Sequence, residues 1–240
     1  MVVPAGLTVV TWNAQGSQGL DIDAAAVALA EFTPDVVLLQ EVQRRHVGTL
    51  RAAMGALDAR WRFKHWPVKV PAEGLGIISM YPLRRVRSHH LAHRWEAWNW
   101  RRRIAVRAEI EILDRFVPIV NVHLGAGVPT DERLHQIRSL LEVSGGASLI
   151  AGDLNAEPDT AELAEFANHG WCDAERRTHP EASGPATHWK AGPRVKPPTQ
   201  RLDYLMVRDR VSVTDTSVPE DWDRWARLSD HLPLVARLGL

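Results

Sequence analysis

Short apolar runs that end abruptly at a polar residue constrain the fold of this chain more than any other feature. Residues 7–12 are rich in β-branched and aromatic side chains and precede Asn13, while residues 36–39 are continuously apolar with Glu41 just beyond them. Such side chains favour strands, and an uninterrupted apolar run is typical of a strand buried on both faces. The pattern therefore predicts sheets whose strand ends carry polar side chains.

Segments with helical spacing lie between the apolar runs. Asp21 is a favourable N-cap for one predicted helix, and Pro129 with acidic residues behind it opens another. This alternation predicts an α/β fold, and 240 residues suit one large α/β sandwich, so we expect a single domain over residues 1–240. The predicted helices cover residues 22–32, 47–57, 129–141 and 160–167, and the predicted strands cover residues 7–12, 36–39, 75–80, 83–91, 104–112, 116–122, 148–151, 202–207, 211–218 and 232–238.

Two of these regions have a distinctive pattern. Residues 104–112 alternate aliphatic residues with a second set that includes Arg107, Glu109 and Glu111, which predicts a strand with one face in water. Residues 179–200 contain five prolines and two glycines without regular periodicity, so they are predicted to form a long surface loop. A loop of this length in a compact enzyme often borders the functional site.

Composition excludes several classes of protein. The 29 Lys and Arg residues balance the 29 Asp and Glu residues, so no overall positive charge concentrates nucleic acid around the chain. Cys172 is the only cysteine, which excludes an internal disulfide and a cysteine-based zinc cluster. No uncharged stretch approaches the roughly 18 residues of a membrane span, and the N-terminus lacks a signal-peptide pattern. We therefore expect a cytoplasmic protein without a membrane span.

Carboxylate, amide and imidazole residues gather at the predicted strand ends. Each alone has a structural explanation, such as a turn residue, an exposed charge or an Asx turn within residues 152–155. Together they indicate a site, because strand ends bring together residues that are remote in sequence. The residues are Asn13, Glu41, His123, Asp153, Asn155, Asp203 and His231, with Asp230 beside the last.

These side chains suit the attack of water on a phosphate ester. Mg²⁺ prefers oxygen ligands, so Glu41 and Asn13 form a plausible ligand set that Asp230 could complete. Asp153 would orient or deprotonate water, while Asn155 would hold the nucleophile or a phosphate oxygen.

The imidazoles fit the same reaction. His123 and His231 could donate hydrogen bonds to oxygens that gain negative charge, and Asp203 would fix the tautomer of His231.

Nine segments with polar or conspicuous residues follow one another over nearly the whole chain. They are Thr11-Trp12-Asn13, Leu39-Gln40-Glu41-Val42, 74–82, Arg103-Ile104-Ala105-Val106, Asn121-Val122-His123-Leu124, 133–136, Gly152-Asp153-Leu154-Asn155, Arg201-Leu202-Asp203-Tyr204 and Ser229-Asp230-His231-Leu232-Pro233. In this order they resemble the endonuclease/exonuclease/phosphatase superfamily.

The resemblance implies a four-layer α/β/β/α sandwich of two mixed sheets, dependence on Mg²⁺ or Mn²⁺, and hydrolysis of a phosphodiester or phosphomonoester. It assigns metal binding to Asn13, Glu41 and Asp230. It assigns catalysis to His123, Asp153, Asn155 and His231, and a supporting role to Asp203.

Residues 94–103 bear on the choice of substrate, because three tryptophans are interleaved with four arginines in this segment. Trp98 and Trp100 could stack on bases while Arg103 pairs with phosphate, which would suit nucleic acid. The tryptophans could equally pack under a hairpin or contact a membrane interface. Trp222 and Trp225 similarly fit either a wall of the cleft or a packed corner.

Three functions remain open from the sequence. A metal-dependent nuclease or phosphodiesterase is favoured by the full motif set. A phosphatase or a sphingomyelinase-like phospholipid phosphodiesterase on the same scaffold is the alternative, and a non-catalytic nucleic-acid or protein-binding module is the third. The oligomeric state is left open.

Overall fold

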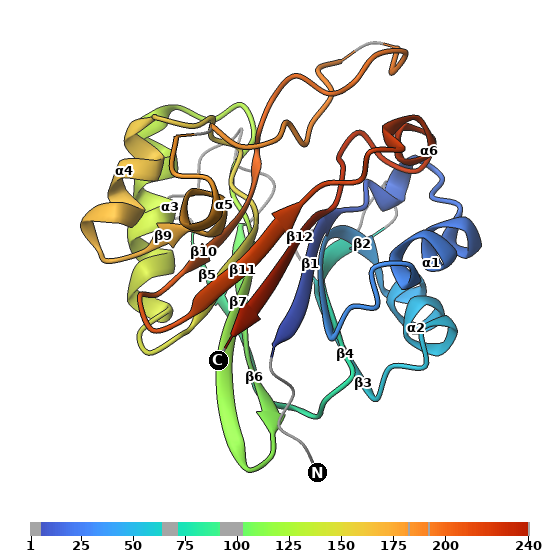
Figure 1. Cartoon of the computed structure of the whole chain (residues 1–240), viewed down its shortest axis with the longest axis horizontal. Coiled ribbons are helices and arrows are strands. Elements are labelled where there is room, and N and C mark those ends of the chain that lie inside the picture. The colour runs from blue at the N-terminus through green and yellow to red at the C-terminus, as the bar shows by residue number, and fades with distance from the viewer. Residues whose placement is uncertain (1–5, 64–71, 92–102, 182, 192, 240) are drawn as a thin grey trace.

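Two six-stranded mixed sheets packed face to face form the centre of the molecule, with helices on both outer faces (Figure 1). The computed structural model describes residues 6–63, 72–91, 103–181, 183–191 and 193–239. The predicted four-layer α/β/β/α sandwich is therefore confirmed.

The first sheet has the strand order β11-β12-β1-β2-β4-β3. β1 and β2 are parallel neighbours, so their carboxyl ends lie at the same edge. Its strands are β1 (Leu7–Asn13), β2 (Val36–Gln43), β3 (Asp58–Phe63), β4 (Glu73–Ser79), β11 (Ser212–Ser217) and β12 (Leu234–Gly239).

The second sheet has the order β5-β6-β7-β8-β10-β9. Its parallel pair is β7 and β8, and β10 runs antiparallel to β8. Its strands are β5 (Leu83–His90), β6 (Ile104–Ile112), β7 (Arg115–His123), β8 (Leu149–Asp153), β9 (Cys172–Asp173) and β10 (Asp203–Val207).

Helices cover the outer face of each sheet. On the side of the first sheet lie α1 (Ile22–Ala30), α2 (Arg44–Ala53) and α6 (Trp222–Ala226). On the side of the second lie α3 (Thr130–Val143) and α4 (Ala161–Asn168). The short α5 (Ala174–Thr178) contacts β10 and β11, and a 3₁₀ turn η1 (Gly16–Gln18) follows β1.

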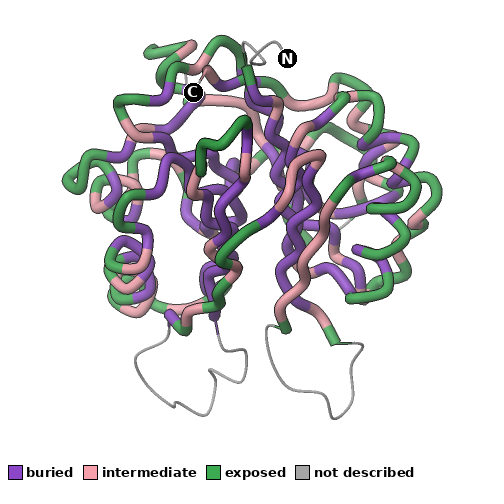
Figure 2. Tube along the Cα trace, turned by 90° about the horizontal axis from the view of Figure 1, so that it is seen from below, coloured by how far each residue is buried: buried purple, intermediate pink, exposed green. Residues whose placement is uncertain are grey.

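Three apolar cores account for the four layers. The central core, between the sheets, includes Leu38 and Val106. A second joins the first sheet to its helices through Leu29, and a third joins the second sheet to α3 and α4 through Phe166 and Leu140. Figure 2 shows the same division, with buried tubes at the centre and exposed segments on the outside.

A polar contact links the two sheets below the candidate site. Gln40 Nε2 of β2 donates to Asn121 Oδ1 of β7 at 2.8 Å. Asn121 Nδ2 in turn donates to the carbonyl oxygens of Leu39 and Gly76, at 3.0 and 2.9 Å. Since all these groups are buried, each bond satisfies a group that would otherwise carry a desolvation cost.

The structure differs from the sequence prediction in several elements. β3, β9, α5 and α6 were not predicted. α2 occupies residues 44–53 rather than 47–57, and Gly55, with a φ of 63°, follows its last turn as a left-handed residue typical of a helix end. β2 continues through a bulge to Gln43 instead of ending at residue 39.

The predicted water-exposed face of β6 is mostly covered. Glu109 is 8% exposed and pairs with Arg85, while Arg107 reaches over to the carbonyl oxygens of Val143 and Gly145. α3 lies over this face. The polar residues that alternate along β6 therefore bind protein partners instead of facing solvent. Every helix in the described part of the chain is too short or too polar to span a bilayer.

Candidate active site

Strand register brings the predicted residues to one edge of the sandwich. His123 ends β7 opposite Asp153 of β8, and Asp203 opens β10 opposite the same aspartate. Asn13 ends β1 in the facing sheet. Residues from both sheets therefore meet at the edge where the parallel strands end.

Glu41 lies in the bulge of β2. Its backbone adopts a left-handed conformation with φ of 50°, and the register of β2 against β4 shifts between Leu39 and Val42. Bulges of this kind redirect a side chain and are common beside active sites. Glu41 Oε1 lies 3.7 Å from His123 Nδ1, so the bulge places a carboxylate from the first sheet against an imidazole from the second.

Asp153 is the centre of the arrangement. Its Oδ2 accepts a hydrogen bond from Asn13 Nδ2 at 3.0 Å and lies 3.4 Å from His123 Nε2 and 3.8 Å from His231 Nε2. Its Oδ1 accepts the backbone N–H of Asn155 at 2.9 Å, which is the Asx turn that the sequence left open. One carboxylate thus faces side chains from three other segments of the chain.

Gly152 allows β8 to place this carboxylate. A Cβ at this position would lie 1.9 Å from the carbonyl oxygen of Val122, and its φ is 146°. Only glycine permits such a close approach of two strands with this backbone. The residue before Asp153 is therefore fixed by packing.

His231 is held in place by three separate contacts. Its Nδ1 lies 2.7 Å from Asp203 Oδ2, and both side chains are buried. Trp12 Nε1 donates to the carbonyl oxygen of His231 at 2.9 Å, and the His231 N–H donates to Ser229 Oγ at 3.1 Å. Ser229 Oγ donates onward to the carbonyl oxygen of Asn13 at 2.6 Å, so the segment is anchored to β1.

Burial and neighbouring charges raise the pKa values of two site residues, which favours the neutral form of Asp153 and the cationic form of His231. Burial raises the pKa of Asp153 from 3.8 to about 6, although His231 acts against this. Burial alone would lower the pKa of His231, but the carboxylates of Asp203 and Asp153 outweigh it and raise the value from 6.5 to about 10. At neutral pH the site therefore combines a cationic imidazole with a carboxyl group whose pKa lies close to that pH.

His188 is a site residue that the sequence analysis did not identify. It lies in the predicted loop 179–200 and bridges to His231 and to Gln200 through the backbone. Its ring centroid is 4.5 Å from that of His231, and burial lowers its pKa. Its Nδ1 lies 3.2 Å from Gln200 Oε1. The only sequence signal was the expectation that this loop borders the site.

The remaining predicted residues occupy the margins. Asn155 Nδ2 donates to the carbonyl oxygen of Leu124 at 3.0 Å. Asp230 Oδ2 accepts from Gln15 Nε2 at 2.7 Å. Arg103 is buried immediately before β6, at the edge where His123 ends β7.

The tryptophans fall into two groups. Trp98 and Trp100 lie outside the described residues. Trp225 is buried, lies edge-on to Trp12 with centroids 5.3 Å apart and stacks on Phe32 at 5.7 Å. It therefore belongs to a packed corner and not to a cleft wall.

The arrangement could hold a divalent cation. Ligand atoms of Asp153, Asp203 and His231 lie within 4.8 Å of one another, as do those of His188, Asp230 and His231. Carboxylate and imidazole groups suit Mg²⁺ or Mn²⁺, and the raised pKa of Asp153 shows that its buried carboxylate lacks full compensation. The residues present thus fit a metal-assisted reaction.

Comparison with known families agrees with the motif pattern. Residues 10–231 match the model of the Endonuclease/Exonuclease/phosphatase family, which spans almost the whole sandwich. A comparison with curated protein sequences finds no significant match.

Solved structures share the fold at low sequence identity. An endonuclease/exonuclease/phosphatase from Bacteroides vulgatus superposes with a TM-score of 0.81 and 18% identity, covering 98% of this chain and 99% of that one. TDP2 from D. rerio, complexed with a single-strand DNA product, gives 0.71 and 20%, with 98% and 100% covered. A mannosyl-6-phosphatase from Bacteroides thetaiotaomicron gives 0.75 and 15%, also with 98% and 100% covered.

Proposed function

Because the chain belongs to the endonuclease/exonuclease/phosphatase family, whose members are hydrolases of phosphoesters, we propose that it hydrolyses a phosphodiester by metal-assisted, in-line attack of water. The observation that carries the proposal is the convergence on Asp153 of Asn13 from one sheet and His123 and His231 from elsewhere in the chain. Asp153 is buried among several polar side chains and its pKa is raised, and this combination is more typical of a functional site than of an aspartate with a structural role alone.

Metal binding falls to side chains that offer oxygen ligands. Glu41 and Asn13 supply a carboxylate and an amide oxygen from the first sheet, and Asp230 supplies a further carboxylate. Mg²⁺ or Mn²⁺ bound there would polarise a phosphate oxygen and stabilise the leaving oxygen. Glu41 Oε1 lies 3.7 Å from His123 Nδ1, so the imidazole can orient the glutamate. His123 does not itself have to bind the ion for this role.

Asp153 activates the nucleophile in this proposal. A carboxyl group with a pKa of about 6 can accept a proton from water near neutral pH more readily than an ordinary aspartate. The hydrogen bond from Asn13 fixes its Oδ2, and the N–H of Asn155 fixes its Oδ1. Asn155 therefore has a positioning role in addition to any contact of its side chain with substrate.

The histidines stabilise the charge that develops during attack. His231 is cationic at neutral pH because Asp203 and Asp153 raise its pKa, so its Nε2 can donate to a phosphate oxygen. Asp203 holds Nδ1 and hence the direction of the ring. His123, between Glu41 and Asp153, is placed to donate to a second oxygen.

The substrate class is the least constrained part of the proposal. We favour a nuclease or another phosphodiesterase, since the sequence places Trp98 and Trp100 just before Arg103, and a structural neighbour was solved with single-strand DNA. A phosphatase or a phospholipid phosphodiesterase is the second candidate, favoured by the fold shared with a mannosyl-6-phosphatase.

A substrate panel tests the function directly. Plasmid DNA, a short single-stranded oligonucleotide, sphingomyelin, a sugar phosphate and a chromogenic diester would be incubated with the full chain, with and without Mg²⁺ or Mn²⁺. We expect metal-dependent turnover of at least one diester, and a rate about 10²- to 10⁴-fold lower with Asp153→Asn. Turnover of the monoester alone would move the phosphatase to first place. Absence of turnover on every phosphate ester would reject the hydrolase and favour a binding module.

A further inference from the structure

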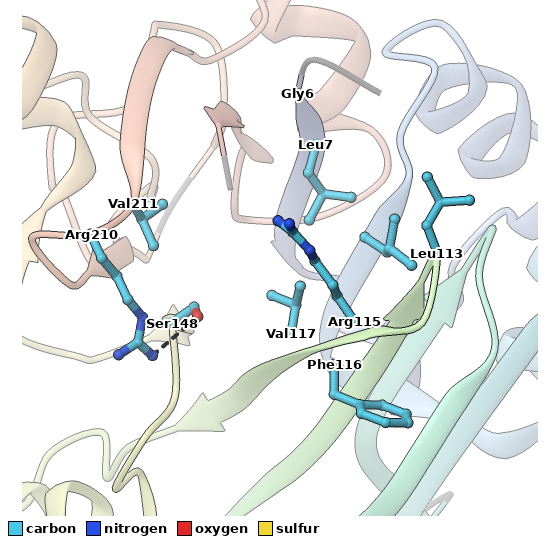
Figure 3. Close-up of a pocket in the computed structure, with 10 residues that line it drawn as sticks. Gly6, Leu7, Leu113, Arg115, Phe116, Val117, Ser148, Arg210 and Val211 are labelled. Atoms are coloured by element: carbon cyan, nitrogen blue, oxygen red, sulfur yellow. Dashed lines mark hydrogen bonds between the residues drawn. The ribbon is translucent and has the colours of Figure 1, made fainter. Parts of the chain in front are cut away.

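A hollow beside two arginines lies at the end of the sandwich opposite the candidate active site. Figure 3 shows it between the starts of β1 and β7 and the residue that precedes β8. Its volume of about 380 Å³ falls within the range of about 300–1,000 Å³ of small-molecule pockets. Its apolar lining consists of Leu7, Ile112, Leu113, Phe116, Val117 and Val211.

Strand geometry separates this hollow from the candidate active site. Leu7 opens β1 at the hollow and Asn13 ends it at the site, so six rises of about 3.3 Å place them roughly 20 Å apart. Ser148 and Asp153 mark the same two ends along β8. A small molecule in the hollow therefore cannot touch the reacting groups.

The apolar wall is only partly covered. Leu113 and Phe116, which are 38% and 48% exposed, are two of the six exposed large hydrophobic side chains in the described part of the chain. The side chains of Leu7, Val117 and Val211 point toward one another across the hollow (Figure 3). Binding of an apolar group here would be favourable, because it would remove this exposed apolar surface from water.

Arg115 supplies a positive charge without a counter-charge. Its side chain extends from β7 toward Leu7 (Figure 3), and the guanidinium group forms no hydrogen bond or ion pair with any residue that the structure describes. Asp114 lies beside it in the β6–β7 turn but does not line the hollow. No aspartate or glutamate is among the described lining residues.

Arg210 adds a second, better fixed guanidinium. Its Nη2 donates to the carbonyl oxygens of Gly146 and Ala147, at 2.8 and 3.1 Å, and to Ser148 Oγ at 3.3 Å. Its remaining N–H groups make no hydrogen bond to other described residues. Neutral acceptors thus hold the side chain while its charge stays uncompensated.

We infer that this hollow binds a small amphiphilic anion, with its carboxylate or phosphate at Arg115, a medium-length acyl body against Leu7 and Val117, and Arg210 as a second positive charge on the far side of the hollow. Two guanidinium groups without a carboxylate favour an anion, and the apolar lining favours a chain over a free ion. The assignment does not depend on the proposed hydrolysis, since it concerns the opposite end of the strands.

Calorimetry with octanoate tests the pocket. We expect saturable binding at one site, with affinity at least about tenfold higher than for 1-octanol, which lacks the charge, or for inorganic phosphate, which lacks the chain. Methyl NMR should show perturbations at Leu7, Val117 and Val211. Equal affinity for octanol, or perturbations centred on His231, would overturn the assignment.

Matched arginine variants locate the charge. Arg115→Gln should weaken octanoate binding about tenfold, because one charge-assisted contact is lost. Arg87→Gln removes the same charge from an exposed position on β5 that does not line the hollow, and it should leave binding unchanged. Both arginines are exposed, so both variants should fold. An equal loss in the two variants would show a nonspecific charge effect and reject the site.

Discussion

His231 Nδ1 lies 2.7 Å from Asp203 Oδ2, and the two side chains form a buried ion pair that crosses from the C-terminal segment to β10. The pair leaves Nε2 of the same ring 3.8 Å from Asp153. One aspartate therefore sets the orientation and charge of the imidazole, and a second aspartate lies near the other ring nitrogen.

Asp203→Asn should lower the pKa of His231 in the metal-free protein. The folded-state pKa of about 10 exceeds the ordinary 6.5, so the stabilisation is fully present below pH 6.5 and is lost as the pH rises toward 10. The unfolding free energy of the wild type should therefore fall more steeply between pH 7 and 10 than that of the variant. NMR titration of His231 and thermal denaturation across this range measure both effects. An unchanged His231 pKa would show that Asp203 does not cause the shift.

Asp153→Asn should abolish most hydrolysis while preserving the fold. The amide cannot accept the proton of water, and loss of a general base typically costs about 10²- to 10⁴-fold in rate. The rate on the best substrate of the panel gives the measurement. Asp209→Asn, at a highly exposed position paired with Arg177, is the control and should keep the wild-type rate. A rate above half that of the wild type for Asp153→Asn would reject its role.

Glu41→Gln should raise the Mg²⁺ concentration needed for half-maximal rate. A neutral amide is a poorer partner for a hard dication than a carboxylate. Excess EDTA should silence the wild type, and added Mg²⁺ or Mn²⁺ should restore it. Glu142→Gln, exposed on α3, is the matched control. Full activity after dialysis against EDTA would exclude the proposed metal dependence.

His188→Ala should lower kcat/KM by about tenfold, as expected for one lost hydrogen bond to a charged phosphate. His188 lies against the ring of His231, so it can face a substrate at this edge. Steady-state kinetics on a diester give the value, with the exposed His169→Ala as the control. Unchanged kcat/KM would limit His188 to anchoring its loop.

Gly152→Ala should destabilise the protein by about 1–3 kcal/mol or more, because its Cβ would collide with the carbonyl oxygen of Val122. Gly48→Ala, in α2 with open space around it, should instead stabilise by about 0.5–1 kcal/mol. Chemical denaturation of the two variants compares them. Equal stabilities would show that β7 and β8 separate without cost.

The fold and most site residues could be predicted from the sequence because strand periodicity and motif order are local properties. Residues 104–112 form β6 with the predicted bounds, and His123 ends β7 as expected. The chain order of the motifs then fixed the family, which the match over residues 10–231 confirms. The functional roles of the site residues remain predictions.

Other features depend on tertiary contacts that no local pattern contains. β3 is an exception, because residues 58–63 alternate charged and apolar side chains with the period of a strand, so this local pattern could have predicted it. His188 comes to the site through backbone pairing with Gln200 and His231, far away in sequence. The left-handed backbone of Glu41 likewise follows from the bulge opposite β4, which extends β2 past its predicted end.

The contact between Gln40 and Asn121 has a consequence for how the protein becomes active during folding. One residue along a strand is about 3.3 Å, which is comparable to the separations of 3.0 Å between Asn13 and Asp153 and 3.7 Å between Glu41 and His123, the contacts that join the two sheets at the site. A slip of one sheet over the other by a single residue would therefore dismantle the site while leaving every strand intact. Gln40 and Asn121 oppose that slip, because sliding would break three buried hydrogen bonds between the sheets. A folding intermediate with both sheets formed but unaligned would be inert, so the first appearance of turnover in a refolding experiment would time the alignment step.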